Sequence, residues 1–194
     1  MRAGRPRGFD EGEALERAMQ LFWSRGYENT KLADLLSEMQ ISRQSLYDTF
    51  GNKRALFLRT IEHYKGTQLS QALALLERDR PPLENVTAVV HFFRELASDD
   101  RCRGCLVANA LVEMAPRDAE IAAVLGETLD LLQSALEGAL SQAQAQGALG
   151  PAKSPRTLSL AITNAMLGMA VTGKLEGRRA NLGEIYDGTL ALLA

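Results

Sequence analysis

The chain has 194 residues, of which 46% are hydrophobic and 24% are charged, which is enough apolar material for one or two packed domains. No apolar run approaches the length of about 18 residues that a membrane helix needs, and the basic N-terminus leads into acidic residues and not into the apolar stretch of a signal peptide. Two cysteines are too few for a disulfide-stapled secreted domain, so we expect a cytoplasmic protein with no membrane partner.

The charge is unevenly distributed along the chain. Residues 1–65 carry 11 Lys and Arg against 9 Asp and Glu, whereas the remaining residues carry 11 against 15. The segment before Asp10 holds three arginines and no acid. A basic arm on an otherwise acidic protein indicates an anionic partner bound at one end of the molecule, although a disordered tail has the same composition.

Apolar residues recur at spacings of three and four in the first part of the chain, which predicts helices, and no alternating β pattern is found. Asp10, Thr30, Ser42 and Asn52 are each suited to cap the start of a helix, and Gly26 is suited to end the first one. The helices expected here are 11–25, 31–39, 43–50 and a long one at about 53–78. The first helix places its apolar face at Leu15, Ala18, Met19 and Phe22.

The second part of the chain is also predicted to be helical. The paired prolines Pro81 and Pro82 interrupt the pattern, because proline cannot continue a helix. A loop rich in Gly and Pro spans 147–155. The helices expected here are about 84–98, a short one that ends near 115, then 117–146, 156–175 and 182–193. The sequence therefore predicts an all-α fold.

The second and third helices are joined by a tight turn, which is typical of a helix-turn-helix unit. Leu35, Ile41 and Leu46 are spaced to meet in a small core that fixes the angle between the two helices. The third helix is then left with a polar outer face that fits the major groove of DNA. There Arg43 can read guanine and Gln44 can read adenine through paired hydrogen bonds.

Other side chains near this unit have donors suited to DNA. Tyr47, Thr30 and Lys53 can reach phosphates, and Lys53 also lies near a helix N-terminus, which is itself an anion site. Arg5 and Arg7 of the basic arm can extend into a neighbouring minor groove. From the pattern alone, a generic helical bundle that merely exposes polar residues on its third helix remains an alternative.

Residues 4–64 closely resemble the DNA-binding domain of TetR-family transcriptional regulators, through the segments AMQLFWSRGYENTKLADL and ISRQSLYDTFGNKRALF. In the second segment Tyr47, Phe50, Lys53 and Leu56 have the spacing of the family. The resemblance implies a homodimer in which a basic arm and helix-turn-helix domain at 1–52 is followed by a helical regulatory and dimerisation domain at 53–194. It also implies DNA contacts at Thr30, Arg43, Gln44, Ser45, Tyr47 and Lys53.

The closing helices offer a surface for dimerisation. Segment 158–171 is apolar on every face, so it must be buried on every face, and the core of one chain can cover only part of it. We therefore expect a homodimer through the last two helices, although a central helix of a monomer would show the same pattern. A mostly apolar ligand cavity is expected beside these helices. Its candidate lining residues, each of which could instead be a packing residue of the core, are Tyr64, Phe93, Leu96, Asn109, Met114 and Met166.

Cys102 and Cys105 form a Cys-x-x-Cys pair. The pair supplies two of the four ligands of a closed zinc site, and no histidine has the spacing to complete it, so no metal or cofactor is expected. The segment RGCLVANALVEMAPRDAEIAAVL resembles a TetR subgroup in which an RGC or GCL element opens a helix beside the ligand cavity, and this points to Cys105 as a sensor. The helix dipole, with Arg101 and Arg103, would favour a reactive thiolate there. A buried, inert cysteine remains the alternative.

The chain has none of the motifs that mark common enzymes, such as a Gly-rich phosphate loop, HExxH or GxSxG. The sequence thus predicts a DNA-binding regulator that is not an enzyme. As the resemblance implies, it would be a homodimeric repressor, released from a palindromic operator by a small-molecule effector or by cysteine modification. The alternative is a helical metal- or redox-responsive binding protein without a DNA function.

Overall fold

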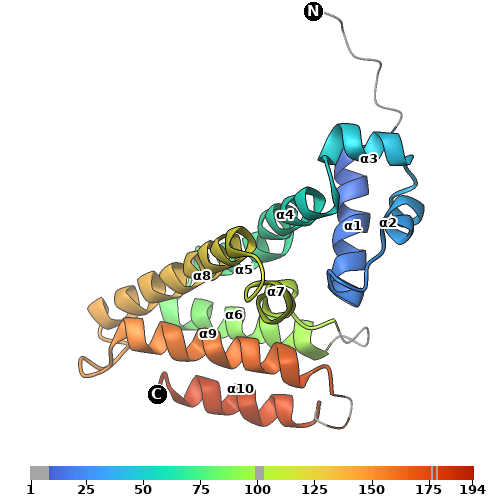
Figure 1. Ribbon diagram of the computed structural model, residues 1–194. Coiled ribbons are helices and arrows are strands. Elements are labelled where there is room, and N and C mark those ends of the chain that lie inside the picture. The colour runs from blue at the N-terminus through green and yellow to red at the C-terminus, as the bar shows by residue number, and fades with distance from the viewer. Residues whose placement is uncertain (1–8, 99–102, 176, 178) are drawn as a thin grey trace, which may run out of the picture. The chain divides into compact units, whose positions relative to one another are not determined.

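The computed structural model describes residues 9–98, 103–175, 177 and 179–194, and within these ranges the chain forms helices and no strand (Figure 1). The all-α prediction is confirmed. The chain divides into two compact units, an N-terminal unit at Met1–Tyr64 and a C-terminal unit at Lys65–Ala194. The division lies after the fourth helix and not after residue 52, where we expected it.

The N-terminal unit contains α1 (Glu11–Arg25), α2 (Leu32–Met39), α3 (Arg43–Phe50) and α4 (Lys53–Tyr64). Asp10 caps α1 as predicted, since its carboxylate accepts a hydrogen bond from the Glu13 amide at 2.8 Å. The residues predicted to form the inner face of α1 are all buried: Leu15, Ala18, Met19 and Phe22. The helix-start prediction at this end of the chain is therefore confirmed.

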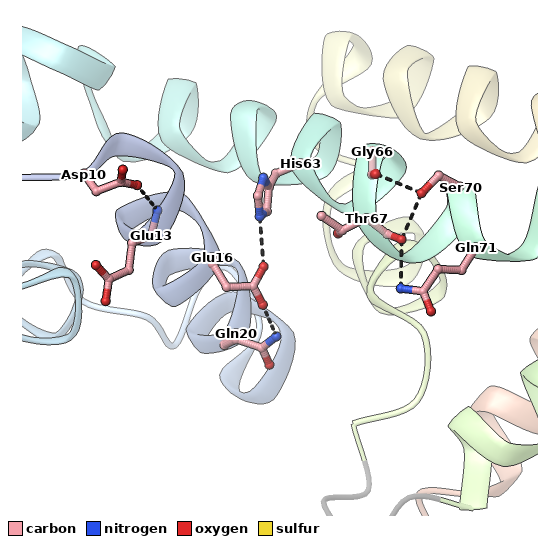
Figure 2. A network of polar contacts seen from close by, with 9 residues as sticks. All are labelled: Asp10, Glu13, Glu16, Gln20, His63, Gly66, Thr67, Ser70 and Gln71. Atoms are coloured by element: carbon pink, nitrogen blue, oxygen red, sulfur yellow. Dashed lines mark hydrogen bonds and ion pairs between the residues drawn. The ribbon is translucent and has the colours of Figure 1, made fainter.

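Packing between α1 and α4 explains why α4 belongs to the N-terminal unit. The Phe57 ring of α4 packs edge-on against the rings of Phe22 and Tyr27, with centroid distances of 5.0 Å in both pairs. At the end of α4, His63 Nε2 lies 2.8 Å from Glu16 Oε2 on α1 (Figure 2). A domain boundary at the turn before α4 would cut through this core. The turn alone therefore does not locate the boundary between the two units.

The helix expected at 53–78 is interrupted. After α4 the chain makes a π-helical turn at Lys65–Leu69 and then α5 (Ser70–Leu76). Side chains of the following turn donate to its carbonyls: Ser70 Oγ lies 2.8 Å from the Gly66 oxygen and 3.0 Å from the Thr67 oxygen, and Gln71 Nε2 lies 3.1 Å from the Thr67 oxygen (Figure 2). These bonds satisfy backbone carbonyls at the point where the hydrogen-bond pattern changes from α-helical to π-helical and back.

The C-terminal unit continues with α6 (Pro82–Ser98), α7 (Leu106–Met114), α8 (Ala119–Ala145), α9 (Pro155–Thr172) and α10 (Asn181–Ala191). Helix α9 packs against α6, α8 and α10 around one apolar core (Figure 1). The large side chains of this core include Val86, Val89, Val90, Phe93, Leu136, Leu140, Ile162, Met166 and Met169. None of the helices among the described residues is long and apolar enough to cross a membrane.

Two glycines bring neighbouring segments against the end of α9. A Cβ atom on Gly173 would overlap the carbonyl oxygen of Ala97, near the end of α6. A Cβ atom on Gly104, which has a φ of +64°, would lie 2.5 Å from the carbonyl oxygen of Ala170. Only glycine permits these close approaches, so the end of α6 and the segment before α7 are both held by backbone contact with α9.

Candidate DNA-binding interface and sensor site

The turn between α2 and α3 has the geometry of a helix-turn-helix. Gln40 ends α2 in the left-handed conformation, with a φ of +55°. Ser42 caps α3 as predicted, because its hydroxyl accepts a hydrogen bond from the Ser45 amide at 3.0 Å. The three residues predicted to hold the two helices together are all buried: Leu35, Ile41 and Leu46. Helix α3 is therefore fixed on a packed base.

The outer face of α3 is polar and exposed. Arg43 makes no hydrogen bond or ion pair with the residues that the structure describes, and Tyr47 is 45% exposed. Gln44 Nε2 donates to Asp48 Oδ1 at 2.7 Å, one turn further along the helix. Arg43, Gln44 and Tyr47 thus present unburied polar groups from adjoining positions of one helix, which is the arrangement that a major-groove reader requires.

Arg59 of α4 holds the C-terminal end of α3, a role that the sequence did not reveal. Its guanidinium donates to the Thr49 carbonyl oxygen at 3.4 Å, lies 5.0 Å from the centre of the Phe50 ring and forms an ion pair with Glu11 of α1. The residues Glu11 and Arg59 are 48 positions apart. No local pattern connects residues so distant, so only the fold could show that they meet.

Lys53 begins α4, whose first turn is capped as predicted by Asn52, with the Ala55 amide 2.9 Å from Asn52 Oδ1. The Lys53 ammonium lies 4.2 Å from the centre of the Tyr27 ring. A cation held at an aromatic face beside a helix N-terminus is well placed to meet a phosphate.

The prediction for Thr30 is wrong in its capping role. Lys31 is the N-cap of α2, and its amide bonds to the Asp34 carboxylate at 3.2 Å. Thr30 is fully buried, and its hydroxyl donates to the Gly26 carbonyl oxygen at 2.6 Å. The Thr30 hydroxyl proton is thus used inside the N-terminal unit. Ser45 is also engaged, since its hydroxyl lies 2.9 Å from that of Ser42.

Cys105 lies at the N-cap of α7 and is 6% exposed. Asn109, one turn into the helix, donates to the Arg103 carbonyl oxygen at 2.9 Å and accepts a hydrogen bond from the Lys174 ammonium. Burial lowers the pKa of Lys174 from its ordinary value, whereas the negative charges of a Cys105 thiolate and of Glu113 act to raise it. A cation therefore lies within electrostatic reach of the Cys105 sulfur, on a residue that the sequence did not single out.

The predicted cavity residues occupy different surroundings. Tyr64 belongs to the N-terminal unit, where its ring packs edge-on against Trp23 at 5.3 Å. Phe93 and Met166 are buried in the core of the C-terminal unit, and Met114 is buried at the end of α7. All four side chains are buried in these surroundings. Among the described residues, no group of three or more His, Cys, Asp or Glu side chains is arranged to hold a metal ion.

Comparison with known protein families matches both units. The family model described as bacterial regulatory proteins, tetR family, matches residues 14–60, and that of the tetracyclin repressor-like C-terminal domain matches residues 82–188. The chain belongs to the TetR family. It is accordingly a transcriptional regulator with a DNA-binding helix-turn-helix, and the TetR family is one of regulators and not of enzymes.

TetR-family relatives extend this comparison. The chain is 36% identical over 145 residues to the uncharacterized HTH-type transcriptional regulator YezE of Bacillus subtilis (strain 168), with 73% of each chain covered. It is 33% identical over 146 residues to the HTH-type transcriptional repressor ComR of Escherichia coli (strain K12), covering 73% of this chain and 69% of ComR. A cysteine mutant of the TetR regulator CifR, complexed with 26bp double-strand operator DNA, matches with a TM-score of 0.86 at 29% identity, over 96% of this chain and 98% of CifR.

Three of the residues predicted to have a function are not described by the structure. Arg5 and Arg7 of the basic arm and Cys102 of the cysteine pair lie outside the described residues. Of the predicted DNA contacts in the TetR helix-turn-helix, Arg43, Gln44 and Tyr47 are exposed and Lys53 is half-buried. They come from α3 and from the first residue of α4.

Proposed function

We propose that the protein is a homodimeric TetR-family repressor of the cytoplasm, which binds a palindromic operator and releases it when a small-molecule effector binds or when Cys105 is modified. The observation that carries this proposal is the exposed polar face of α3, fixed on the buried side chains of Leu35, Ile41 and Leu46. The name of ComR as a repressor and the operator complex of CifR support repression and operator binding. A dimer suits a palindrome because each helix-turn-helix reads one half-site.

In this proposal, base reading and phosphate contact fall to different residues. Arg43 pairs with guanine and Gln44 with adenine, because their side chains offer the matching paired hydrogen bonds. Lys53 and Tyr47 contact phosphates and set the position of α3 in the groove. Arg5 and Arg7 enter the adjoining minor groove. Thr30 is left out of the contact set, because its buried hydroxyl already donates its proton to the Gly26 carbonyl oxygen.

Selection of bound duplexes from random DNA tests the proposal, followed by gel-shift titration of the selected duplex at several salt concentrations. Lys53→Ala should weaken binding to all sequences alike and reduce the salt slope by about one, because it removes one phosphate contact. Gln44→Ala should instead change which bases are preferred at one position of each half-site. A wild-type protein that shows neither sequence preference nor a steep loss of binding with salt would overturn the proposal and favour a helical binding protein without a DNA function.

The outer face of α9 supports the proposed dimer. Segment 157–173 contains no charged residue, and Leu160 and Val171 on α9 are exposed. Beside Val171, α7 and α9 line an open, uncharged hollow of about 460 Å³, bordered by Val112, which is 78% exposed. A two-fold axis places like groups opposite one another, so a neutral apolar face is suited to meet its own copy. The exposed side of α10 also includes small residues, Gly188 and Ala191, which suit close contact with a second copy.

Gly168→Trp should break the proposed dimer without unfolding the chain. A Cβ atom on Gly168 meets nothing within 4 Å of its own chain, so a larger side chain projects outward from α9 into the expected interface. The matched control is Gly126→Trp on α8, where a Cβ atom also meets nothing within 4 Å. Sedimentation analysis should give a dimer for the wild type and the control and a monomer for Gly168→Trp. A dimer in all three proteins would remove α9 from the interface.

The surroundings of Cys105 support its role as the sensor. The Lys174 ammonium lies within electrostatic reach of the Cys105 side chain, which is buried at the N-cap of α7, next to the contact of Gly104 with α9. With N-ethylmaleimide, the thiolate would form a carbon–sulfur bond as the ring double bond opens, and the adjacent carbon would take up a proton from water. The adduct does not fit a 6% exposed position without moving α7.

Treatment with N-ethylmaleimide should release operator from the wild type and from Cys102→Ser, but not from Cys105→Ser, because only the first two proteins keep the Cys105 thiol. Gel-shift titration before and after treatment measures the release. Equal release from Cys105→Ser and the wild type would remove Cys105 from the mechanism. In that case, binding of a small-molecule effector would remain as the proposed trigger of operator release.

A further inference from the structure

We infer that Asp48 determines sequence specificity by positioning Gln44, the residue proposed above to read adenine. The inference rests on the proposed DNA-binding function of α3. Both side chains are exposed on the outer face of this helix, four residues apart, and Gln44 Nε2 donates to Asp48 Oδ1 at 2.7 Å. Asp48 therefore acts through Gln44, and it affects which base Gln44 accepts.

The chemistry of the pair fixes the orientation of the Gln44 amide. An ionised carboxylate only accepts hydrogen bonds, so the amide must turn its NH₂ group, and not its oxygen, toward Asp48. One N–H of Gln44 and its carbonyl oxygen then remain free. Adenine presents in the major groove an acceptor at N7 and a donor at N6, which match this remaining pair.

The same orientation discriminates against guanine. Guanine presents two acceptors, N7 and O6, so the Gln44 oxygen would face another oxygen without a donor between them. An unrestrained glutamine can rotate its amide to reduce this conflict. The hydrogen bond to Asp48 opposes that rotation, because turning the amide would set its oxygen against the carboxylate. Holding the side chain in one conformation before binding also reduces the entropy lost on the DNA.

The charge of Asp48 supports a role in specificity and not in affinity. A carboxylate on the face that meets DNA is repelled by phosphates, which weakens binding to every sequence. Within the described part of the chain, Asp48 forms no ion pair that would neutralise it, and its carboxylate accepts a hydrogen bond from Gln44 on this face. A side chain that lowers affinity for all DNA while it orients a base reader raises the ratio between correct and incorrect sites.

The test uses the full-length chain and duplexes that carry its selected operator with each of the four base pairs at the position read by Gln44. Fluorescence anisotropy gives the affinity of the wild type, Asp48→Ala, Asp48→Asn, Gln44→Ala and the Asp48→Ala/Gln44→Ala double variant. Asp48→Ala should reduce the preference for adenine over guanine by about tenfold, the scale of one paired base contact, and should bind random duplex more tightly. Asp48→Asn keeps an acceptor for Gln44 but loses the charge, so it should bind random duplex more tightly yet retain most of the preference.

The double variant separates positioning from direct reading. If Asp48 acts through Gln44, the double variant should lose no more preference than Gln44→Ala alone. Independent, additive losses would show that Asp48 reads a base itself, and an unchanged preference in Asp48→Ala would show that it has no role; either result overturns the inference. Unfolding midpoints should stay at the wild-type value, because both side chains are exposed. A wild type that selects no operator would instead overturn the proposed function.

Discussion

Gly173→Ala is expected to destabilise the C-terminal unit by about 3 kcal/mol, the upper part of the usual range for overpacking. The added methyl group would overlap the carbonyl oxygen of Ala97 and would also lie 2.9 Å from its carbon. Both clashing atoms belong to backbone, so no side-chain rotation relieves them. The φ of Gly173 is −61°, which alanine adopts without strain, so the whole effect comes from the separation of α6 and α9. Denaturant unfolding at a fixed protein concentration measures it.

The matched control for this substitution is Gly126→Ala on α8. There the new methyl group meets nothing within 4 Å, so the change should stabilise the helix by about 1 kcal/mol through helix propensity alone. The two variants should therefore shift the unfolding midpoint in opposite directions. Equal stability of Gly173→Ala and the wild type would mean that α6 and α9 are not held in backbone contact at this point.

Phe57→Ala is expected to unfold the N-terminal unit. Phe57 is 1% exposed and is the ring that contacts both Phe22 and Tyr27. Removing a buried phenylalanine costs about 3 to 5 kcal/mol, which is close to the whole stability that the core of a unit of this size supplies. Hydrogen exchange of the amides in α1 and α4, together with operator binding, reports the loss. Both protection and binding should disappear.

Phe57→Leu provides the conservative comparison for the ring cluster. It keeps most of the buried volume and loses the edge-on contacts, so it should cost about 1.5 kcal/mol or less and leave the unit folded. Operator binding by Phe57→Ala at wild-type affinity would show that the ring cluster does not hold the helix-turn-helix in place.

Local patterns were sufficient to predict much of the N-terminal unit. Asp10, Ser42 and Asn52 cap helices as expected, because each cap is decided by a side chain and an amide two or three residues away. Thr30 has the same chemistry, but its hydroxyl bonds back to the Gly26 carbonyl oxygen and the next residue becomes the cap. Two bonds of similar strength compete at this position, and a sequence pattern does not rank them.

Longer-range features could not be read from the sequence. Helical periodicity indicates that Tyr64 has a buried side but not that its neighbour is Trp23. Lys174 bonds to Asn109 across 65 positions, and Arg59 bonds to Glu11 across 48. Such pairs depend on how helices pack, whereas periodicity reports only which side of a helix is apolar.

The two glycine contacts at the end of α9 have a mechanical consequence. Gly104 meets the Ala170 carbonyl oxygen and Gly173 meets that of Ala97, so the segment before α7 and the end of α6 both contact the last turn of α9. Side-chain contacts absorb small shifts by changing rotamer, but backbone in contact with backbone has no such compliance. If the segment that carries Cys105 moves, α9 would therefore have to move with it. In the proposed switch, modification of Cys105 would therefore act on α9, the proposed dimer helix, through the backbone contact of Gly104.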